Sequence, residues 1–377
     1  MIHTDPDLAA AVGPRVRKSP YFDATVRAGL TEVSTYNHMW LPMSYGDADA
    51  EYRRLTTGVS MWDVAAQRHV LVDGADAGEL VQLLTAIDVS SLRPGRARYA
   101  PVVDHDGVLL NDPVLLRMPD GSWRFSIADA DVRLWFAAIA HGVGLDASVT
   151  ELDTATLAVQ GPDAGAVAAD LGIGWFDELD HFDLREATVA SIPLVLSRSG
   201  WSTEGGFELF LDDPDRAEEL WDAVAAAGES HGIGPGAPNA PERIENALLS
   251  YGTDSGYHAD PIELGLESHL DLDGPPFIGQ DALRRIRADG PRRRLRGVVI
   301  EGEGLGVLPH PVPFLADGEP VGELRAAASS PRFGRDLGLA LVDAACEPGT
   351  VGTVALLDGN RKAELVTLPF EDSLDGR

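Results

Sequence analysis

Two carboxylates in apolar surroundings are the residues of this sequence best placed to do chemistry. Glu208 follows Phe207 in "SRSGWSTEGGFELF" (197–210), inside a segment whose pattern predicts a strand. Asp112 stands in "GVLLNDPVLL" (107–116), between two runs of apolar residues. A charged side chain that points inward needs a partner, because an unpaired charge is costly to bury. Both residues are therefore candidates for binding or catalysis.

The pattern around Glu208 is consistent with two interpretations. Alternation alone is equally consistent with an edge strand that leaves Glu208 in solvent and with an inward-facing carboxylate. In the second case the carboxylate could accept two N–H bonds from a flat heterocycle with an amide-like edge, such as a pterin or a guanine. Trp201 could stack on that ring or form a pocket wall. Three glycines would allow close backbone approach: Gly200, Gly205 and Gly206.

Asp112 is harder to explain from its neighbours. Asn111-Asp112-Pro113 is typical of an exposed turn. The apolar flanks instead indicate a strand that packs on at least one face. Composition and periodicity thus disagree, and neither gives the acid a role.

Aromatic residues gather at several other places. Tyr36 and Trp40 lie in "TYNHMW", and Tyr99 and Trp175 stand alone. They could be ordinary packing residues, or they could form a box for a cation, since ring faces attract sulfonium and ammonium groups. The sequence leaves both interpretations open.

Charge and composition exclude several classes of partner. The 377 residues include 60 acidic and 30 basic side chains, for a formal net charge of −30. This acidity argues against nucleic acid and anionic membranes as partners, because both are polyanions. No signal peptide and no apolar run long enough to span a membrane occurs, and the single cysteine, Cys346, excludes an internal disulfide. We expect a cytoplasmic enzyme, and the scattered histidines give no support for a metal site.

The order of predicted elements indicates an α+β protein. We expect helices over 47–58, 76–87 and 129–142, with Asp76 as a cap of the second. Two strands should pair around the turn "DHDG" (104–107). A basic linker, 287–296, should separate a terminal region of short strands, a small all-β domain.

Several stretches together resemble a known family. The blocks "RYAPVVDHDGVLLNDPVLL", "RSGWSTEGGFEL" and "RIENALLSYGTD…DPIELGL…FIGQDAL" are similar to the glycine-cleavage T-protein (aminomethyltransferase) superfamily. Within it, "STYNHMWLP", "WDVAAQRHV", "AVQGP" and "GPGAPN" most resemble the dimethylsulfoniopropionate demethylases. The resemblance covers about residues 20 to 370.

The resemblance implies a fold of class α+β, a three-domain cloverleaf around a central folate site. One folate-binding α+β domain would be discontinuous, formed by 20–58 and 150–285. A second α+β domain would occupy 59–149. A C-terminal β-barrel or jelly-roll-like domain would occupy 290–372.

The resemblance also implies roles for particular residues. Asp112 matches the family's essential aspartate, and Tyr99 and Val114 match residues that line the folate. Glu208 matches the glutamate that binds the pterin edge, and Trp201 occupies the adjacent aromatic position. The cofactor would be tetrahydrofolate. Phe210 stands where the sulfonium demethylases have a tyrosine, so we count it, with Tyr36, Trp40 and Trp175, among the candidate substrate-binding residues.

The implied function is transfer of a methyl group from a sulfonium donor to N5 of tetrahydrofolate. The alternatives are demethylation of another N- or O-methyl donor and aminomethyl transfer. Aminomethyl transfer is disfavoured, since Asn239 stands where the T-protein has arginine. The iron–sulfur-assembly branch is disfavoured too, since Phe277 stands in "PPFIGQDAL" and no cysteine lies there. The expected partner is a small-molecule methyl donor, with neither nucleic acid nor membrane, and a homodimer is one candidate assembly.

Overall fold

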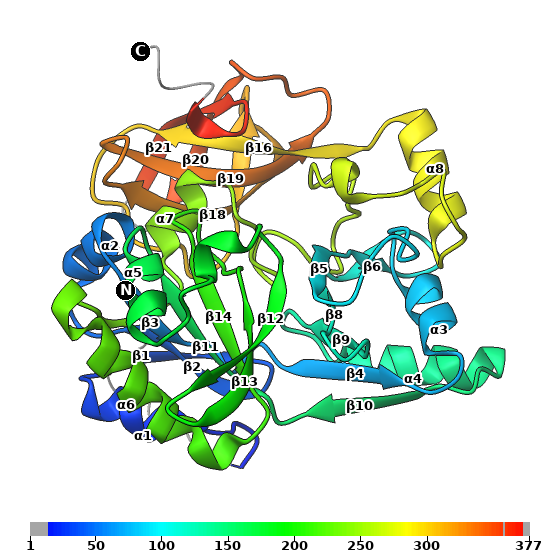
Figure 1. Ribbon diagram of the computed structural model, residues 1–377. Coiled ribbons are helices and arrows are strands. Elements are labelled where there is room, and N and C mark those ends of the chain that lie inside the picture. The colour runs from blue at the N-terminus through cyan, green and yellow to red at the C-terminus, as the bar shows by residue number, and fades with distance from the viewer. Residues whose placement is uncertain (1–13, 357–358, 372–377) are drawn as a thin grey trace.

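The computed structural model describes residues 14–356 and 359–371, arranged as three lobes around a common centre (Figure 1). Two lobes each combine an antiparallel sheet with helices, and the third is a closed barrel. The predicted fold class is confirmed: an α+β chain with a C-terminal barrel. The exact domain boundaries given above stay a prediction.

The first lobe is built on a six-stranded sheet, at the lower left of Figure 1. One face packs against helices, and its core includes Val159, Phe207 and Leu209. Sheet order is β12 (Leu184–Val189), β13 (Ile192–Ser197), β14 (Gly206–Leu211), β11 (Ala155–Gln160), β3 (Ser60–Asp63) and β15 (Gly234–Gly236). The helices of the lobe are α1 (Phe22–Arg27), α2 (Ala48–Thr57), α5 (Ala164–Asp170) and α6 (Ala217–Gly228), with short 3₁₀ turns at Phe176–Glu178, Pro214–Arg216 and Glu229–His231. The next helix, α7 (Ala240–Glu245), packs against the C-terminal barrel.

The second lobe lies in the chain between two strands of the first. Its antiparallel sheet has the order β10 (Ser148–Leu152), β4 (His69–Asp73), β9 (Trp123–Ser126), β8 (Val114–Arg117) and β5 (Arg96–Tyr99). Helices α3 (Ala77–Leu84) and α4 (Val132–Val143) cover it. Leu152 pairs with His69, so the point where the chain enters this sheet lies beside the point where it leaves.

The third lobe is a barrel closed by antiparallel pairing. Its order is β16 (Arg293–Ile300), β19 (Arg335–Asp343), β18 (Glu319–Ser330), β17 (Val312–Ala316), β20 (Val351–Leu356) and β21 (Gly359–Val366), and β21 pairs with β16 again. Between the first lobe and the barrel run a 3₁₀ turn, Glu267–His269, and α8 (Gln280–Asp289). The predicted linker 287–296 is mostly regular structure: it contains the end of α8 and the start of β16, and Gly290–Arg292 alone connect them.

Two small two-stranded hairpins are separate from the larger sheets. β1 (Glu32–Tyr36) pairs with β2 (Met39–Ser44) across Asn37 and His38, which both have positive φ, as a two-residue turn requires. β6 (Val102–Val103) pairs with β7 (Leu109–Asn111), and Asp104 accepts hydrogen bonds from the backbone of Asp106 and Val108. The predicted hairpin at "DHDG" is therefore confirmed.

The predicted helices are found, but one cap is different. Asp47 caps α2 by accepting from the Ala50 N–H at 2.9 Å. Asp76 occupies the N-cap position of α3, yet its carboxylate accepts from the Asp146 N–H at 2.8 Å instead. The carboxylate thus ties the helix start to the segment before β10, a long-range contact that local pattern cannot reveal.

Candidate functional site

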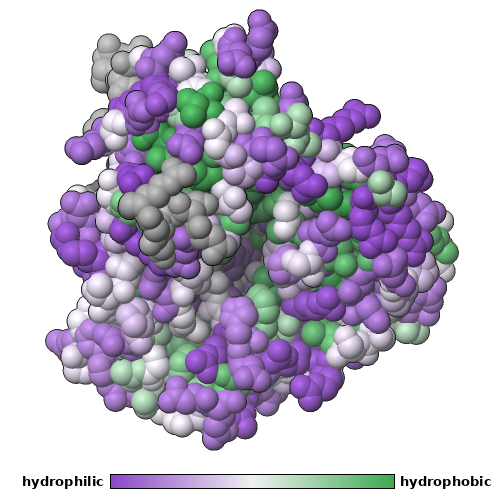
Figure 2. All heavy atoms as spheres, turned by 90° about the horizontal axis from the view of Figure 1, so that it is seen from above, coloured by the Kyte–Doolittle hydropathy of each residue, from purple (hydrophilic) through white to green (hydrophobic). Residues whose placement is uncertain are grey.

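A cavity of about 1280 Å³ lies where the lobes meet. Seen from above the barrel, the molecule is hollowed near its middle (Figure 2). The wall of this cavity includes residues from the six-stranded and the five-stranded sheet, from the β1–β2 hairpin and from the loop before β17. Seven predicted site residues line it: Tyr36, Tyr99, Asp112, Val114, Trp201, Glu208 and Phe210.

Asp112 lies at a break between two strands of different sheets. β7, which ends at Asn111, pairs with β6. β8, which starts at Val114, belongs to the five-stranded sheet. Asp112 and Pro113 form the step between them, so the carboxylate points away from either ladder and into the cavity wall. The flanks are strands, as the apolar pattern indicated, whereas Asp112 and Pro113 form an irregular break of two residues that is neither a turn nor exposed.

Neighbouring groups hold the Asp112 carboxylate and set its proton affinity. The Tyr99 hydroxyl donates to Oδ2 at 3.0 Å. Burial raises the pKa of Asp112 to about 7; the Tyr99 hydrogen bond lowers it and the charge of Asp254 raises it further. Burial also raises the pKa of Tyr36, as do the charges of Asp112 and Asp129. Asp112 is thus poised to change protonation near neutral pH.

Glu208 lies on a central strand, so the edge-strand interpretation is wrong. β14 runs between β13 and β11, and Glu208 faces Ser197 and Ala158 across the sheet. Its neighbours Phe207 and Leu209 point into the helix-covered core, so alternation turns Glu208 to the opposite face, toward the cavity. The Ser199 hydroxyl donates to Oε2 at 2.5 Å. Burial raises the pKa of Glu208, and this hydrogen bond lowers it.

The loop that carries Trp201 is fixed by a buried glutamine. Nε2 of Gln160 donates to the Ser199 carbonyl at 3.2 Å, and Oε1 accepts from the Ser202 hydroxyl at 2.8 Å. A Cβ at Gly200 would lie 2.0 Å from Oε1 of Gln160, so only glycine permits this packing. Trp201 is half-buried and lines the cavity between these anchor points.

Comparison with known proteins places the chain in a family. Residues 22–274 match the GCVT N-terminal domain, and residues 293–372 match the glycine cleavage T-protein C-terminal barrel domain. The chain belongs to the glycine-cleavage T-protein (aminomethyltransferase) family. The matches to these two domains confirm the resemblance to this family that was inferred from the sequence.

Relatives in the T-protein family include both kinds of enzyme considered above. The chain is 35% identical to dimethylsulfoniopropionate demethylase DmdA of Ruegeria pomeroyi, over 92% of this chain and 95% of that protein. It is 32% identical to a probable aminomethyltransferase of Natronomonas pharaonis, over 94% and 99%. Aminomethyltransferase T of the glycine cleavage system from Bartonella henselae has the same fold, with a TM-score of 0.83, 21% identity, and coverage of 94% and 98%. The chain is accordingly an enzyme of the one-carbon transferase type.

Two aromatic candidates lie outside the wall of the cavity. Trp175 packs against the first lobe's core, and the Arg185 guanidinium lies 4.7 Å from its ring centroid. Trp40 pairs with Thr35 in the β1–β2 hairpin and is half-buried. Neither residue is among those that line the cavity. A cation box that includes these two tryptophans therefore has no geometric support, although the other two aromatic residues proposed for it, Tyr36 and Tyr99, both line the cavity.

Three residues of the site were not predicted from the sequence. Asn111 is fully buried and exchanges two hydrogen bonds with the backbone of Ala128, at 3.0 and 3.1 Å, which fixes the step at Asp112. Gln160 holds the Trp201 loop, and Arg243 of α7 lines the cavity. For Asn111 and Gln160 the available signal was an amide that ends an apolar run, since a buried amide needs a specific partner. Arg243 stands among polar residues and gave no such signal.

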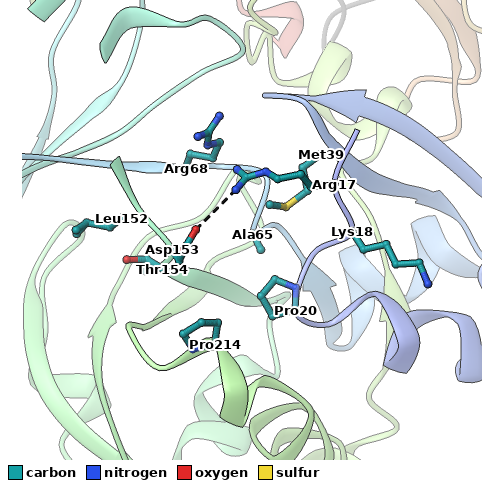
Figure 3. A pocket seen from close by; sticks show the side chains of 10 residues that line it. All are labelled: Arg17, Lys18, Pro20, Met39, Ala65, Arg68, Leu152, Asp153, Thr154 and Pro214. Atoms are coloured by element: carbon teal, nitrogen blue, oxygen red, sulfur yellow. Dashed lines mark ion pairs between the residues drawn. The ribbon is translucent and has the colours of Figure 1, made fainter. Parts of the chain in front are cut away.

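A second, shallow pocket is unrelated to this site. It measures about 110 Å³, less than a tenth of the central cavity, and lies between the N-terminal segment and the start of β11 (Figure 3). Its Arg17 lies 3.7 Å from Asp153 and 3.6 Å from Glu151, so its charge is already balanced.

Two further observations concern membranes and metal ions. Within 14–356 and 359–371, no helix is long and apolar enough to cross a membrane. In the same residues, His, Cys, Asp and Glu side chains form no group of three that could hold a metal ion.

Proposed function

We propose that this enzyme transfers a methyl group from a sulfonium donor, of the dimethylsulfoniopropionate kind, to N5 of tetrahydrofolate. The bond from the methyl carbon to sulfur breaks with its electron pair left on sulfur, a bond from that carbon to N5 forms, and N5 releases its proton to solvent, so the products are 5-methyltetrahydrofolate, a thioether and a proton. The observation that carries the proposal is the pair of carboxylates, Glu208 and Asp112, in the wall of one large cavity. Identity of 35% to a dimethylsulfoniopropionate demethylase supports the choice of donor.

The residues of the cavity fit a pterin. Glu208 offers a buried carboxylate that could accept two N–H bonds from the pterin edge, and Trp201 offers an aromatic surface beside it. Tyr99 and Val114, paired across β5 and β8, would line the folate next to Asp112. When bound, tetrahydrofolate supplies N5 as the methyl acceptor.

Asp112 would stabilise positive charge during the transfer. A sulfonium leaves as a neutral thioether, so no general acid is needed to activate it. A cation near Asp112 favours the ionised carboxylate and would lower its pKa, which burial raises to about 7. Tyr99 holds the carboxylate in place, so the charge is stabilised by a group that is already oriented.

The pH profile tests this role. With a sulfonium donor, kcat/KM should rise as the pH increases through about 7, because the ionised form of Asp112 is required and kcat/KM reports the pKa of the free enzyme, whereas kcat should rise at a lower pH, where the bound cation has shifted that pKa. Asp112→Asn should lower the rate at least roughly 100-fold and remove that dependence, while circular dichroism shows an intact fold. Turnover like that of the unchanged enzyme in this variant would exclude the role.

A second candidate is demethylation of an ether or amine donor. An ether oxygen needs a proton in order to leave, and Asp112 with a pKa of about 7 could supply it near neutral pH. The rate would then fall as the pH rises through 7, which is opposite to the sulfonium case. Aminomethyl transfer has less support, since Asn239, which caps α7 by accepting from the Glu242 N–H at 3.1 Å, stands where the T-protein has arginine.

The identity of the donor can be decided directly. The enzyme is incubated with tetrahydrofolate and a panel of sulfonium, quaternary ammonium and methoxyaromatic compounds, and folate products are identified by mass. We expect 5-methyltetrahydrofolate with the sulfonium donors alone. A methylene-folate product, or transfer only from methoxyaromatics, would contradict the proposal.

A further inference from the structure

Arg243 is a cation in the cavity wall that the mechanism above does not use. It is 7% exposed and belongs to the last turn of the short helix α7. Its Nη1 donates to Asp254 at 2.6 Å and to the Leu248 carbonyl at 3.3 Å. Among the described residues, its Nε and Nη2 have no hydrogen-bond partner. Because Arg243 lines the cavity, those N–H groups are available to a ligand there.

Contacts between loops place Arg243 on the Asp112 side of the cavity. Asp254, its partner, belongs to the loop 250–255, whose Tyr251 hydroxyl donates to the Leu110 carbonyl at 2.5 Å. Leu110 precedes Asp112 by two residues on β7. Glu208 and Trp201, which would bind the pterin, lie on β14 and its preceding loop. α7 also contacts the Trp201 loop, since Glu242 accepts from the Thr203 N–H at 2.9 Å. Arg243 itself is paired with Asp254, whose charge acts on Asp112, and on this ground we assign the group near Arg243 to the methyl donor.

Asp254 makes the guanidinium a rigid docking group. This carboxylate is fully buried and also accepts from the Ser250 N–H at 2.9 Å. It occupies one end of the guanidinium and fixes its plane, which leaves the other N–H groups oriented as a fork. A planar fork of N–H donors matches the two oxygens of a carboxylate.

We infer that Arg243 binds a carboxylate of the methyl donor, so that the preferred substrates are zwitterions with an onium group near Asp112 and an acid group a few bonds away. This inference rests on the proposed function. On this inference Arg243 selects methyl donors by their carboxylate group, which takes no part in the methyl transfer.

The test compares two donors with the same sulfonium group: 3-dimethylsulfoniopropionate and its methyl ester. Arg243→Lys keeps the positive charge beside Asp254 but loses the fork. We expect it to raise KM for the zwitterion roughly tenfold or more, with kcat nearly unchanged and KM for the ester unaffected. The same factor for both donors would overturn the inference.

Controls separate this role from folate binding and from folding. Arg198→Lys changes the other arginine of the cavity wall, whose guanidinium lies 5.0 Å from the Phe176 ring centroid, and should not alter the ratio of the two donors. If Arg243→Lys instead raises only KM for tetrahydrofolate, and not for a tetrahydropterin without the glutamate tail, the carboxylate is that of folate and the inference is wrong. A double variant, Arg243→Gln with Asp254→Asn, removes both charges together, and it should lose the preference for the zwitterion as well.

The inference can fail separately from the proposed function. If the enzyme demethylates both donors and neither variant alters their ratio, the function stands and the role of Arg243 falls. If neither donor is demethylated, calorimetric titration with the zwitterion decides. Binding that Arg243→Lys selectively abolishes supports the role, and absent or unchanged binding overturns it.

Discussion

Asp112 illustrates how a single side chain depends on groups from distant parts of the chain. Its proton affinity reflects burial, the Tyr99 hydroxyl and the charge of Asp254. Its position reflects Asn111, which is bonded to the backbone of Ala128. The Asp112 part of the site is thus a titratable acid held by a neutral hydroxyl donor, with the carboxylate of Asp254 near enough to raise its pKa.

The raised pKa of Asp112 should be visible in the stability of the protein. Between pH 4 and pH 7 the unfolded chain releases this proton while the folded chain retains it, so the folded state loses stability as the pH rises. Asp112→Asn removes the effect. Relative to the unchanged protein, the variant should gain about 2 kcal/mol between pH 4 and pH 8, a figure reduced from the full shift because the carboxylate is partly exposed.

Urea unfolding at several pH values measures this difference. Asp63, whose pKa burial raises to about 6, contributes equally to both proteins and cancels. A stability difference that stays constant with pH would mean that Asp112 has an ordinary pKa.

Glu208 should control folate affinity through its charge. Glu208→Gln replaces one acceptor oxygen by a donor, so tetrahydrofolate binding should weaken roughly tenfold to 100-fold in calorimetric titration. Ser199→Ala should weaken binding less, and more at low pH, because loss of its hydrogen bond raises the pKa of Glu208 further. Glu204→Gln changes another carboxylate of the cavity wall and should leave affinity nearly unchanged. Equal losses in Glu204→Gln and Glu208→Gln would refute a specific role for Glu208.

At the scale of elements, the loop between β13 and β14 determines whether Trp201 can face the cavity. Two adjacent glycines where this loop meets β14, Gly205 at its end and Gly206 as the first residue of the strand, differ in their surroundings. A Cβ on Gly206 would lie 2.2 Å from the Val159 carbonyl oxygen, whereas a Cβ on Gly205 would meet nothing within 4 Å. Both have positive φ, so each would be strained by alanine, but only Gly206 lies against the sheet.

The two alanine variants form a matched pair. Gly205→Ala should cost about 1 kcal/mol of stability and leave folate binding intact. Gly206→Ala should cost about 2 kcal/mol more and weaken folate binding, because the loop must move off β11. Thermal unfolding and folate titration check both. Similar behaviour of the two variants would argue against tight packing of this loop.

Much of the site could be predicted from the sequence, and the missing parts have a common cause. The resemblance identified Asp112, Glu208, Trp201, Tyr99 and Val114, and all five line one cavity. Trp40 and Trp175 were chosen for their chemistry alone, and the fold uses Trp175 to pack against the first lobe's core, beneath Arg185. Arg243 and Gln160 were missed because their partners, Asp254 and the Trp201 loop, come near only through tertiary contacts.

The same limit applies to elements. Period and turn residues predicted α2, α4 and the hairpin at "DHDG", where the signal is local. The β1–β2 hairpin was not predicted, although Asn37 at positive φ is a recognised turn residue. The step at Asp112 could not be predicted either, because pattern cannot reveal that β7 and β8 join different sheets.

At the scale of the whole molecule, the net charge of −30 is the dominant physical property. Such an excess of one sign destabilises the compact state through self-repulsion, and salt screens it. Melting temperature should therefore rise as NaCl is increased from about 0.02 to about 1 M. The gain should be larger at pH 8 than at pH 5, where some carboxylates are protonated. Equal gains at both pH values would indicate an effect unrelated to charge.

The pairing of Leu152 with His69 has a consequence for the order of folding. β3 and β11 are neighbours in one sheet, yet the whole second lobe separates them in the chain. Joining them directly would require closure of a long loop, which costs conformational entropy. Once the second lobe has formed, its two ends lie side by side, and the distance left to close is only a few residues at each end. Folding of the inserted lobe thus brings β3 and β11 close together. The sheet that carries Glu208 can then be completed at low cost in conformational entropy.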